Sequence, residues 1–200
     1  TKDQGKSRRR VQQQQGVDRS GSTMKSLRPL LSVCVRYGLI AGGLMVAFFV
    51  ITYYAGHHPL MIAPYLDFRI VLLGMFVFFA LREFRDRFNY GTLHFYQGMM
   101  GSYVVVLVAC SLGSAGLLIF AALESDFVPD YITEMTAYLQ TFSEEDIEAI
   151  GKEIFERNLS LLPATHSRML AISYLGQGLL IGMFVSIIVS VILRKQPKTP

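Results

Sequence analysis

The sequence predicts an all-α integral membrane protein, a four-helix bundle with a small amphipathic helical segment between the third and fourth membrane helices. Three observations lead to this class. Four long apolar runs divide the chain, 52% of its 200 residues are apolar, and the charged residues, only 17%, are strongly clustered. Such a composition favours a chain whose solvent is the bilayer over a soluble domain of the same length.

The apolar runs set the predicted membrane helices. A hydrocarbon core of roughly 30 Å needs about 20 mainly apolar residues per helix. Residues 33–54, 95–122 and 169–193 meet this length. The run at 64–81 is weaker, because only residues 70–81 are free of charge, and a re-entrant segment is the alternative. We expect it to cross the membrane, since three crossings would not separate the basic segments from the acidic one.

Basic residues are distributed unevenly between the predicted sides of the membrane. Fifteen of the 19 Lys and Arg residues lie before or early in the first helix, between the second and third, or after the fourth. By the positive-inside rule, both termini are expected in the cytoplasm of a bacterium, the protein in its inner membrane and residues 124–167 outside. The net charge of +4 is then the sum of a basic inner side and an acidic outer segment. We expect the lipid bilayer as a partner and no nucleic acid.

The first 23 residues are expected to stand apart from a single membrane domain at 24–200. They are polar, with three consecutive arginines and four consecutive glutamines, and cannot bury enough surface to fold alone. Because Met24 resembles a natural start, the tail is interpreted as a cloning remnant or an over-extended gene start, or else as a disordered cytoplasmic arm. Cys34 and Cys110 are expected about 20 Å apart in depth, too far for a disulfide.

The outer segment, residues 124–167, is acidic and is expected to be helical. It holds ten acidic residues against Lys152 and Arg157. Ser143 followed by three acids is typical of a helix start, and apolar residues recur at helical spacing from there to Leu159. We predict one amphipathic helix at 144–159 and an earlier one at 131–139 opened by Pro129. Together they would form a small two-helix cap.

Small residues at four-residue intervals predict close helix packing. In lipid, such ridges allow another helix to approach closely. We favour packing within the chain, with contact to a partner subunit as the alternative. The residues concerned are Gly38 and Gly42 in the first helix, Ala109 and Gly113 in the third, and Gly178, Gly182, Ser186 and Ser190 in the fourth.

Four polar residues are expected at membrane depth, namely Gln97, Ser111, Ser114 and Gln177. Hydrogen bonds between helices account for them, and lining a pathway in a homo-oligomer is the alternative. A proton- or cation-coupled transporter usually keeps an ionisable residue near the midplane. The only such pair, Asp67 with Arg69, is predicted at the outer end of the second helix, which lowers the case for transport.

No catalytic or cofactor motif is found, so an enzyme is not expected. The sequence holds no HExxH word, no phosphate-binding glycine loop and no recognisable nucleophile arrangement. His57, His58 and His166 share the outer side with the carboxylates. Adjacent histidines in a loop do not define ligand geometry, and we expect no metal and no cofactor.

Four short words carry a resemblance to a known family. They are residues 85–87, residues 90–98 with their Tyr-Gly-Thr-Leu-His-Phe-Tyr-Gln-Gly sequence, residues 129–131 and residues 143–148. In these words the chain resembles the bacterial family catalogued as domain of unknown function number forty-one ninety-nine, over about residues 32–195. The resemblance implies an inner-membrane protein of four helices and offers no activity or functional residues.

The expected function is therefore non-enzymatic. We favour an accessory or assembly subunit of a membrane complex, whose small-residue helix faces and acidic outer cap contact membrane-protein partners. The alternative is a small-solute transporter or channel that acts as a homo-oligomer. A third hypothesis is a metal or ligand sensor that uses the outer cap.

Overall fold

The computed structural model describes the backbone of residues 2–62 and 67–195, with side chains from residue 28 onward. Within these ranges the chain is helical without named strands, which confirms the all-α class. The helices are α1 (Lys2–Tyr54), α2 (Phe68–Glu83), α3 (Phe95–Leu123), α4 (Phe127–Leu139), α5 (Glu144–Ile150), α6 (Lys152–Leu161) and α7 (Ser167–Leu193).

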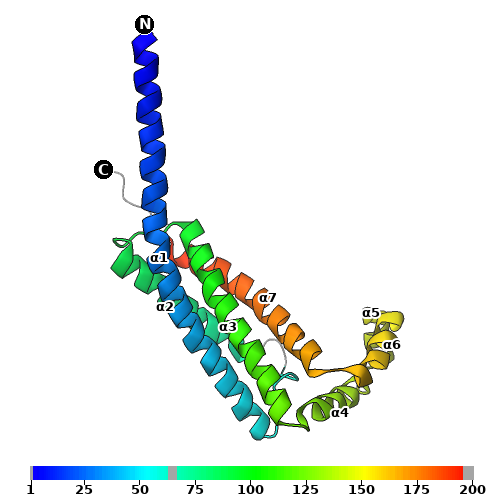
Figure 1. Ribbon diagram of the computed structural model, residues 1–200. Coiled ribbons are helices and arrows are strands. Elements are labelled where there is room, and N and C mark those ends of the chain that lie inside the picture. The colour runs from blue at the N-terminus through cyan, green and yellow to red at the C-terminus, as the bar shows by residue number, and fades with distance from the viewer. Residues whose placement is uncertain (1, 63–66, 196–200) are drawn as a thin grey trace.

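Helices α1, α2, α3 and α7 pack side by side as an elongated bundle (Figure 1). The turn between α2 and α3 and the last turn of α7 lie at one end, which we call the terminal end. Helix α4 lies at the other, which we call the cap end, and α5 and α6 project sideways from there. The first half of α1 continues beyond the terminal end as a single helix. The prediction that residues 1–23 stand apart from the domain stays a prediction.

Three helices are long and apolar enough to cross a membrane: residues 28–54 of α1, all of α3 and all of α7. They match the predicted runs at 33–54, 95–122 and 169–193 within a few residues. The predicted start of the second helix, at residue 64, lies outside the described residues. Helix α2 itself has 16 residues and passes directly into a π-helical turn, Phe84–Phe88. It is therefore the shortest helix of the bundle.

The bundle buries one face of each helix and exposes large apolar side chains on the other. Leu73, Val77, Val105 and Met45 are completely buried. Exposed apolar side chains on α1, α2, α3 and α7 lie on the outward face, as expected of helices that contact lipid. Examples are Leu39, Ile51, Val71, Met75, Leu107, Ile119, Ile172, Leu180, Phe184, Ile188 and Ile192.

The predicted helices of the outer segment have different bounds in the structure. The earlier helix begins at Phe127 instead of residue 131, with Pro129 in its first turn, where its missing N–H costs no hydrogen bond. The predicted helix 144–159 is wrong as a single element. It breaks at Gly151, whose φ of +96° only glycine adopts readily, into α5 and α6.

Candidate functional site

Helix α2 begins at a buried aspartate. Asp67 is 8% exposed, and its Oδ1 accepts the backbone N–H of Arg69 at 2.9 Å. An aspartate in this position satisfies one of the backbone donors that the first turn of a helix leaves unpaired. Asp67 therefore determines where α2 starts.

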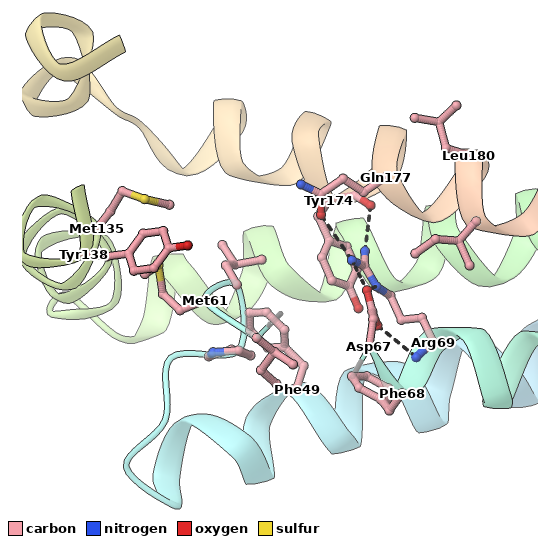
Figure 2. A pocket seen from close by; sticks show the side chains of 14 residues that line it. Phe49, Met61, Asp67, Phe68, Arg69, Met135, Tyr138, Tyr174, Gln177 and Leu180 are labelled. Carbon is pink, nitrogen blue, oxygen red and sulfur yellow. Dashed lines mark hydrogen bonds and ion pairs between the residues drawn. The ribbon is translucent and has the colours of Figure 1, made fainter. Parts of the chain in front are cut away.

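Arg69 joins α2 to α7 through all sides of its guanidinium group. Its Nε donates to Oδ2 of Asp67 at 2.7 Å, Nη1 to the carbonyl oxygen of Tyr174 at 3.1 Å, and Nη2 to Oε1 of Gln177 at 3.2 Å (Figure 2). The group also stacks on the Tyr174 ring, 4.3 Å from its centroid. Its side chain is 7% exposed. The charge is thus paired, hydrogen-bonded and removed from solvent, as a buried arginine requires.

The ion pair lies well inside the bundle. The first turn of α2 is deeper in the bundle than the last residue of α1 and the first residue of α7. The Phe68 ring contacts Phe48, with 4.0 Å between centroids, and Phe48 precedes the last residue of α1 by six residues, about 9 Å of helix. On α7, Tyr174 follows the first residue by seven, about 10 Å. Charged residues at such depth are costly and are generally functional.

A cavity of about 670 Å³ adjoins this ion pair (Figure 2). Its walls come from α1, the start of α2, the segment 59–62 and residues 174–181 of α7. Met135 and Tyr138 of α4 close it at the cap end. Most of the lining is apolar, and Asp67, Arg69 and Gln177 supply the polar part. The volume lies within the range of about 300–1,000 Å³ that small-molecule sites occupy.

The predicted glycine ridges lie at contacts within the chain. A Cβ added to Gly38 or Gly42 would lie 2.8 Å from Val108 or Leu112 of α3. A Cβ on Gly182 would lie 2.2 Å from Val106, and one on Gly178 would lie 2.7 Å from Cys110 Sγ. No side chain larger than hydrogen fits without movement. These four glycines therefore let α3 approach both α1 and α7 closely.

The other small residues on the ridges are buried as well. Ala109 presents its carbonyl oxygen to Gly42, and Gly113 lies against Tyr174. Ser190 contacts Ser102 of α3, with 3.3 Å between the hydroxyl oxygens. The hydroxyl of Ser186 is buried without a hydrogen-bond partner among the described residues.

The four polar residues predicted at membrane depth do not gather on one surface. Gln97 lies at the terminal end, where its Oε1 accepts from Asn89 at 3.1 Å, and Ser114 donates to the carbonyl of Ala171 at 2.8 Å. Both are buried. Ser111 is exposed on α3, and Gln177 lies beside Arg69. Gln97 and Ser114 therefore use their polar groups for contacts between segments of the same chain.

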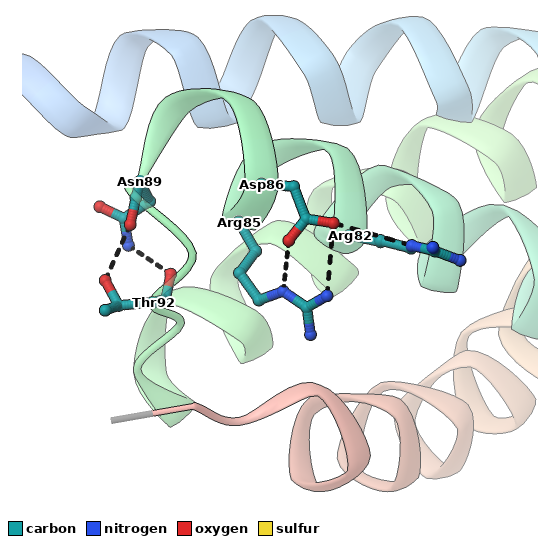
Figure 3. A network of polar contacts seen from close by, with 5 residues as sticks. All are labelled: Arg82, Arg85, Asp86, Asn89 and Thr92. Atoms are coloured by element: carbon teal, nitrogen blue, oxygen red, sulfur yellow. Dashed lines mark hydrogen bonds and ion pairs between the residues drawn. The ribbon is translucent and has the colours of Figure 1, made fainter. Parts of the chain in front are cut away.

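The terminal end is organised by short-range polar contacts (Figure 3). Asn89 and Thr92 exchange two hydrogen bonds of 2.8 Å, and the left-handed backbone of Tyr90 and Gly91 makes the turn between them. Leu93 exchanges two backbone hydrogen bonds with Lys195 after α7. The basic residues Arg82 and Arg85 both contact Asp86, at 3.7 and 2.7 Å. This end is closed by its own backbone and exposes its charges.

Helices α5 and α6, with Ser143 before them, form what we call the arm, residues 143–161. Neither helix buries a single residue. Ser143 caps α5 as predicted, because its hydroxyl accepts the backbone N–H of Asp146 and donates to the Asp146 carboxylate at 2.6 Å. That hydrogen bond lowers the pKa of Asp146. The arm is thus capped at its start and is not packed on the helices of the bundle.

The histidines lie in different environments. His58 is 3% exposed, stacks on Phe127 at 4.6 Å between centroids, and its Nε2 lies 3.2 Å from the Phe127 carbonyl oxygen. Burial lowers its pKa below the ordinary 6.5. The neighbouring His57 is exposed and His166 lies before α7. Among the described residues, no group of three or more His, Cys, Asp or Glu is placed to hold a metal ion.

Asp67 and Arg69 were expected at the outer end of the second helix, and their burial was not predicted. The sequence contains both residues, but how deeply they lie in the bundle depends on how far α1 and α7 extend past α2. A signal was present in the short uncharged run at 70–81, which leaves α2 several residues shorter than its neighbours. A short helix beside long ones leaves a space that other groups must fill.

Comparison with known proteins identifies the family. Neither a curated protein nor a solved structure matches the chain. A family model matches residues 36–195, which include the last third of α1, all the later helices and the outer segment. The predicted resemblance is thereby confirmed, and the chain belongs to the family described as "Protein of unknown function (DUF4199)".

Proposed function

We propose that the chain is a non-enzymatic accessory or assembly subunit of a bacterial inner-membrane complex that recruits its partner through the arm. The single observation that carries this proposal is that α5 and α6 have no buried residue. Helices this short are marginal in water on their own and are usually stabilised by packing of an apolar face. A second protein would supply that packing.

The arm has an apolar stripe of its own. Ile154 and Leu161 are 57 and 51% exposed and lie seven residues apart, on one face of α6. Ile150, at the end of α5 before the break at Gly151, is 43% exposed. Phe142 and Phe155 lie within 6.0 Å of each other between ring centroids and hold the start of the arm to α6. An exposed apolar stripe bordered by polar residues is typical of a protein contact.

The charge of the arm indicates the kind of partner. Glu144, Glu145 and Asp146 start α5, and Glu153 and Glu156 follow on α6. The anionic headgroups of a bacterial membrane repel such a segment, so it is a poor surface anchor. A partner with basic residues around an apolar groove complements it.

The proposed topology places the arm outside. The bundle crosses the bilayer four times, with α2 as the short crossing, because its 16 residues extend only about 24 Å. The basic terminal end is then cytoplasmic, as are both termini. The glycine ridges are used for packing within the chain, so the partner contact is assigned to the arm instead of to the ridges.

Purification from native membranes in mild detergent tests this proposal. A tagged wild-type chain is expected to retain a stoichiometric partner, and the double variant Ile150→Asp, Ile154→Asp is expected to lose it. The matched control, Asn158→Asp with Ser160→Asp, adds the same two charges at exposed polar positions of the arm and is expected to keep the partner. A stable wild-type monomer, or equal retention by all three proteins, would contradict the proposal.

A second candidate, a small-solute transporter or channel acting as a homo-oligomer, is favoured by one observation. Arg69 and Asp67 are ionisable groups inside the bundle, which are usual features of transport pathways. Flux of a candidate solute into proteoliposomes measures this activity. Flux that survives the neutral double variant Asp67→Leu, Arg69→Met would remove this candidate.

A further inference from the structure

The cavity beside Arg69 has a shape and depth that follow from the short α2. It begins under Met135 and Tyr138 of α4 at the cap end and reaches Leu180 on α7. Leu180 follows the first residue of α7 by 13 residues, about 20 Å of helix. The cavity therefore runs from the cap end toward the middle of the bilayer, along the direction in which lipid chains lie.

The cavity also borders the surface that contacts lipid. Leu180 is 60% exposed and Gln177 is exposed, so part of the wall formed by α7 lies at the surface of the bundle. Phe68 is partly buried at the start of α2. A chain from the surrounding bilayer can therefore reach the cavity from the exposed side of α7 without crossing an aqueous layer.

The polar groups of the cavity offer donors instead of net charge. Asp67 neutralises Arg69, which removes the attraction for a small free anion. Arg69 has five N–H donors in a fixed fork, and the carbonyl of Tyr174 and the side chains of Asp67 and Gln177 accept at most four of them. Gln177 uses its oxygen as the acceptor, so its amide group contributes two further donors. This set fits a neutral acceptor such as an ester carbonyl.

From these observations we propose that the cavity holds one acyl chain of an ester-linked bilayer lipid. The chain lies along Phe68, Leu180 and Ile181, and the ester carbonyl accepts hydrogen bonds from Gln177 or Arg69. The site is independent of the partner contact proposed for the arm. Lipid at this place substitutes for the part of the bundle that α2 does not reach.

Photolabelling in vesicles tests the site. The full chain is reconstituted in phosphatidylcholine vesicles that contain a small fraction of phosphatidylcholine with a diazirine on one acyl chain. After illumination, mass spectrometry compares label on Phe68, which lines the cavity and is partly buried, with label on Phe184. Phe184 is 62% exposed on α7 and does not line the cavity, so it reports general contact with lipid. We expect label on both residues in the wild type.

Two variants separate the cavity from the general lipid surface. Ile181→Trp fills the cavity, because Ile181 lines it and is partly buried. The Phe68-to-Phe184 label ratio is then expected to fall about tenfold, because each methylene kept out of an apolar site lowers affinity severalfold. Gln177→Leu removes a donor and is expected to lower the ratio less. The control, Ile172→Trp, alters an exposed residue of α7 outside the cavity and should keep the wild-type ratio. Wild-type ratios in both test variants, or no label at Phe68 in the wild type, would overturn the proposal.

Discussion

The two ends of the bundle solve the same problem in different ways. At the terminal end, a tight turn and the Leu93–Lys195 pairing connect the helices, and charged residues such as Arg36 remain largely in solvent. At the cap end, α2 begins about 9 Å deeper in the bundle than the end of α1. The buried Asp67–Arg69 pair lies at its start, and a cavity remains beneath α4. The terminal end is thus closed by short-range contacts that bury little charge. The costly features are concentrated at the cap end, where we place function.

The largest expected effect is at the buried ion pair. Asp67→Ala leaves Arg69 buried and unpaired, which should lower the free energy of unfolding by about 3–5 kcal/mol. Asp86→Ala is the matched control at the terminal end, where Asp86 is 46% exposed and pairs with Arg85 and Arg82, and should change stability far less. Thermal unfolding in mild detergent, followed by circular dichroism, measures both.

Similar losses in the Asp67 and Asp86 variants would abolish the distinction between the two ends. The double variant Asp67→Leu, Arg69→Met sharpens it further. Because both charges are then absent, much of the lost stability should return. No recovery would mean that the hydrogen bonds of Arg69 to α7, and not the unpaired charge, dominate.

Between the two ends, close packing of α3 and α7 is the next largest effect. Gly182→Ala places a methyl group 2.2 Å from Val106 and is expected to cost about 1–3 kcal/mol. Gly176→Ala, one and a half turns earlier on the same helix, meets nothing within 4 Å and should be neutral or slightly stabilising. The same unfolding measurement decides. Equal effects would show that α7 does not pack through this glycine.

A smaller, local effect is expected in the arm. Gly151→Ala strains a backbone with φ of +96°, at about 1–3 kcal/mol, but only within the arm, because α5 and α6 bury nothing. Hydrogen exchange should therefore rise in residues 144–161 and stay unchanged in the bundle. Faster exchange throughout the protein would mean that the arm is packed on the bundle.

How far the sequence predicts this molecule differs between its regions. The long runs, the sorting of charge and the Ser143 cap are properties of local sequence, and the structure agrees on the three long helices and on the cap. The glycine spacing correctly indicated close approach. The burial of Arg69 depends on the relative lengths of α1, α2 and α7, which no single segment encodes. The break at Gly151 was a visible signal, overlooked because apolar spacing continues across it.

The smallest expected effect is a pH dependence at the cap end. His58 is buried against Phe127 and Tyr131, with Asp130 and Glu134 near it, and burial lowers its pKa below 6.5. The unfolded chain therefore binds the proton more readily, so the contribution of neutral His58 is full above about pH 6.5 and declines as the pH falls below it. The melting temperature should fall between about pH 7.5 and about pH 5.5. His58→Gln should reduce that fall, and an unchanged pH profile would contradict this assignment.

The opposite orientation of the two ends in the membrane is the central claim, and cysteine labelling tests it most directly. Cys34 and Cys110 are buried, so a new surface cysteine can be labelled selectively. In right-side-out vesicles of the bacterial inner membrane, a membrane-impermeant maleimide should label Glu148→Cys in α5. It should label Tyr90→Cys, fully exposed at the terminal end, only after the membrane is opened. Labelling of both cysteines in sealed vesicles would contradict four crossings and the assignment of the cap end to the outside.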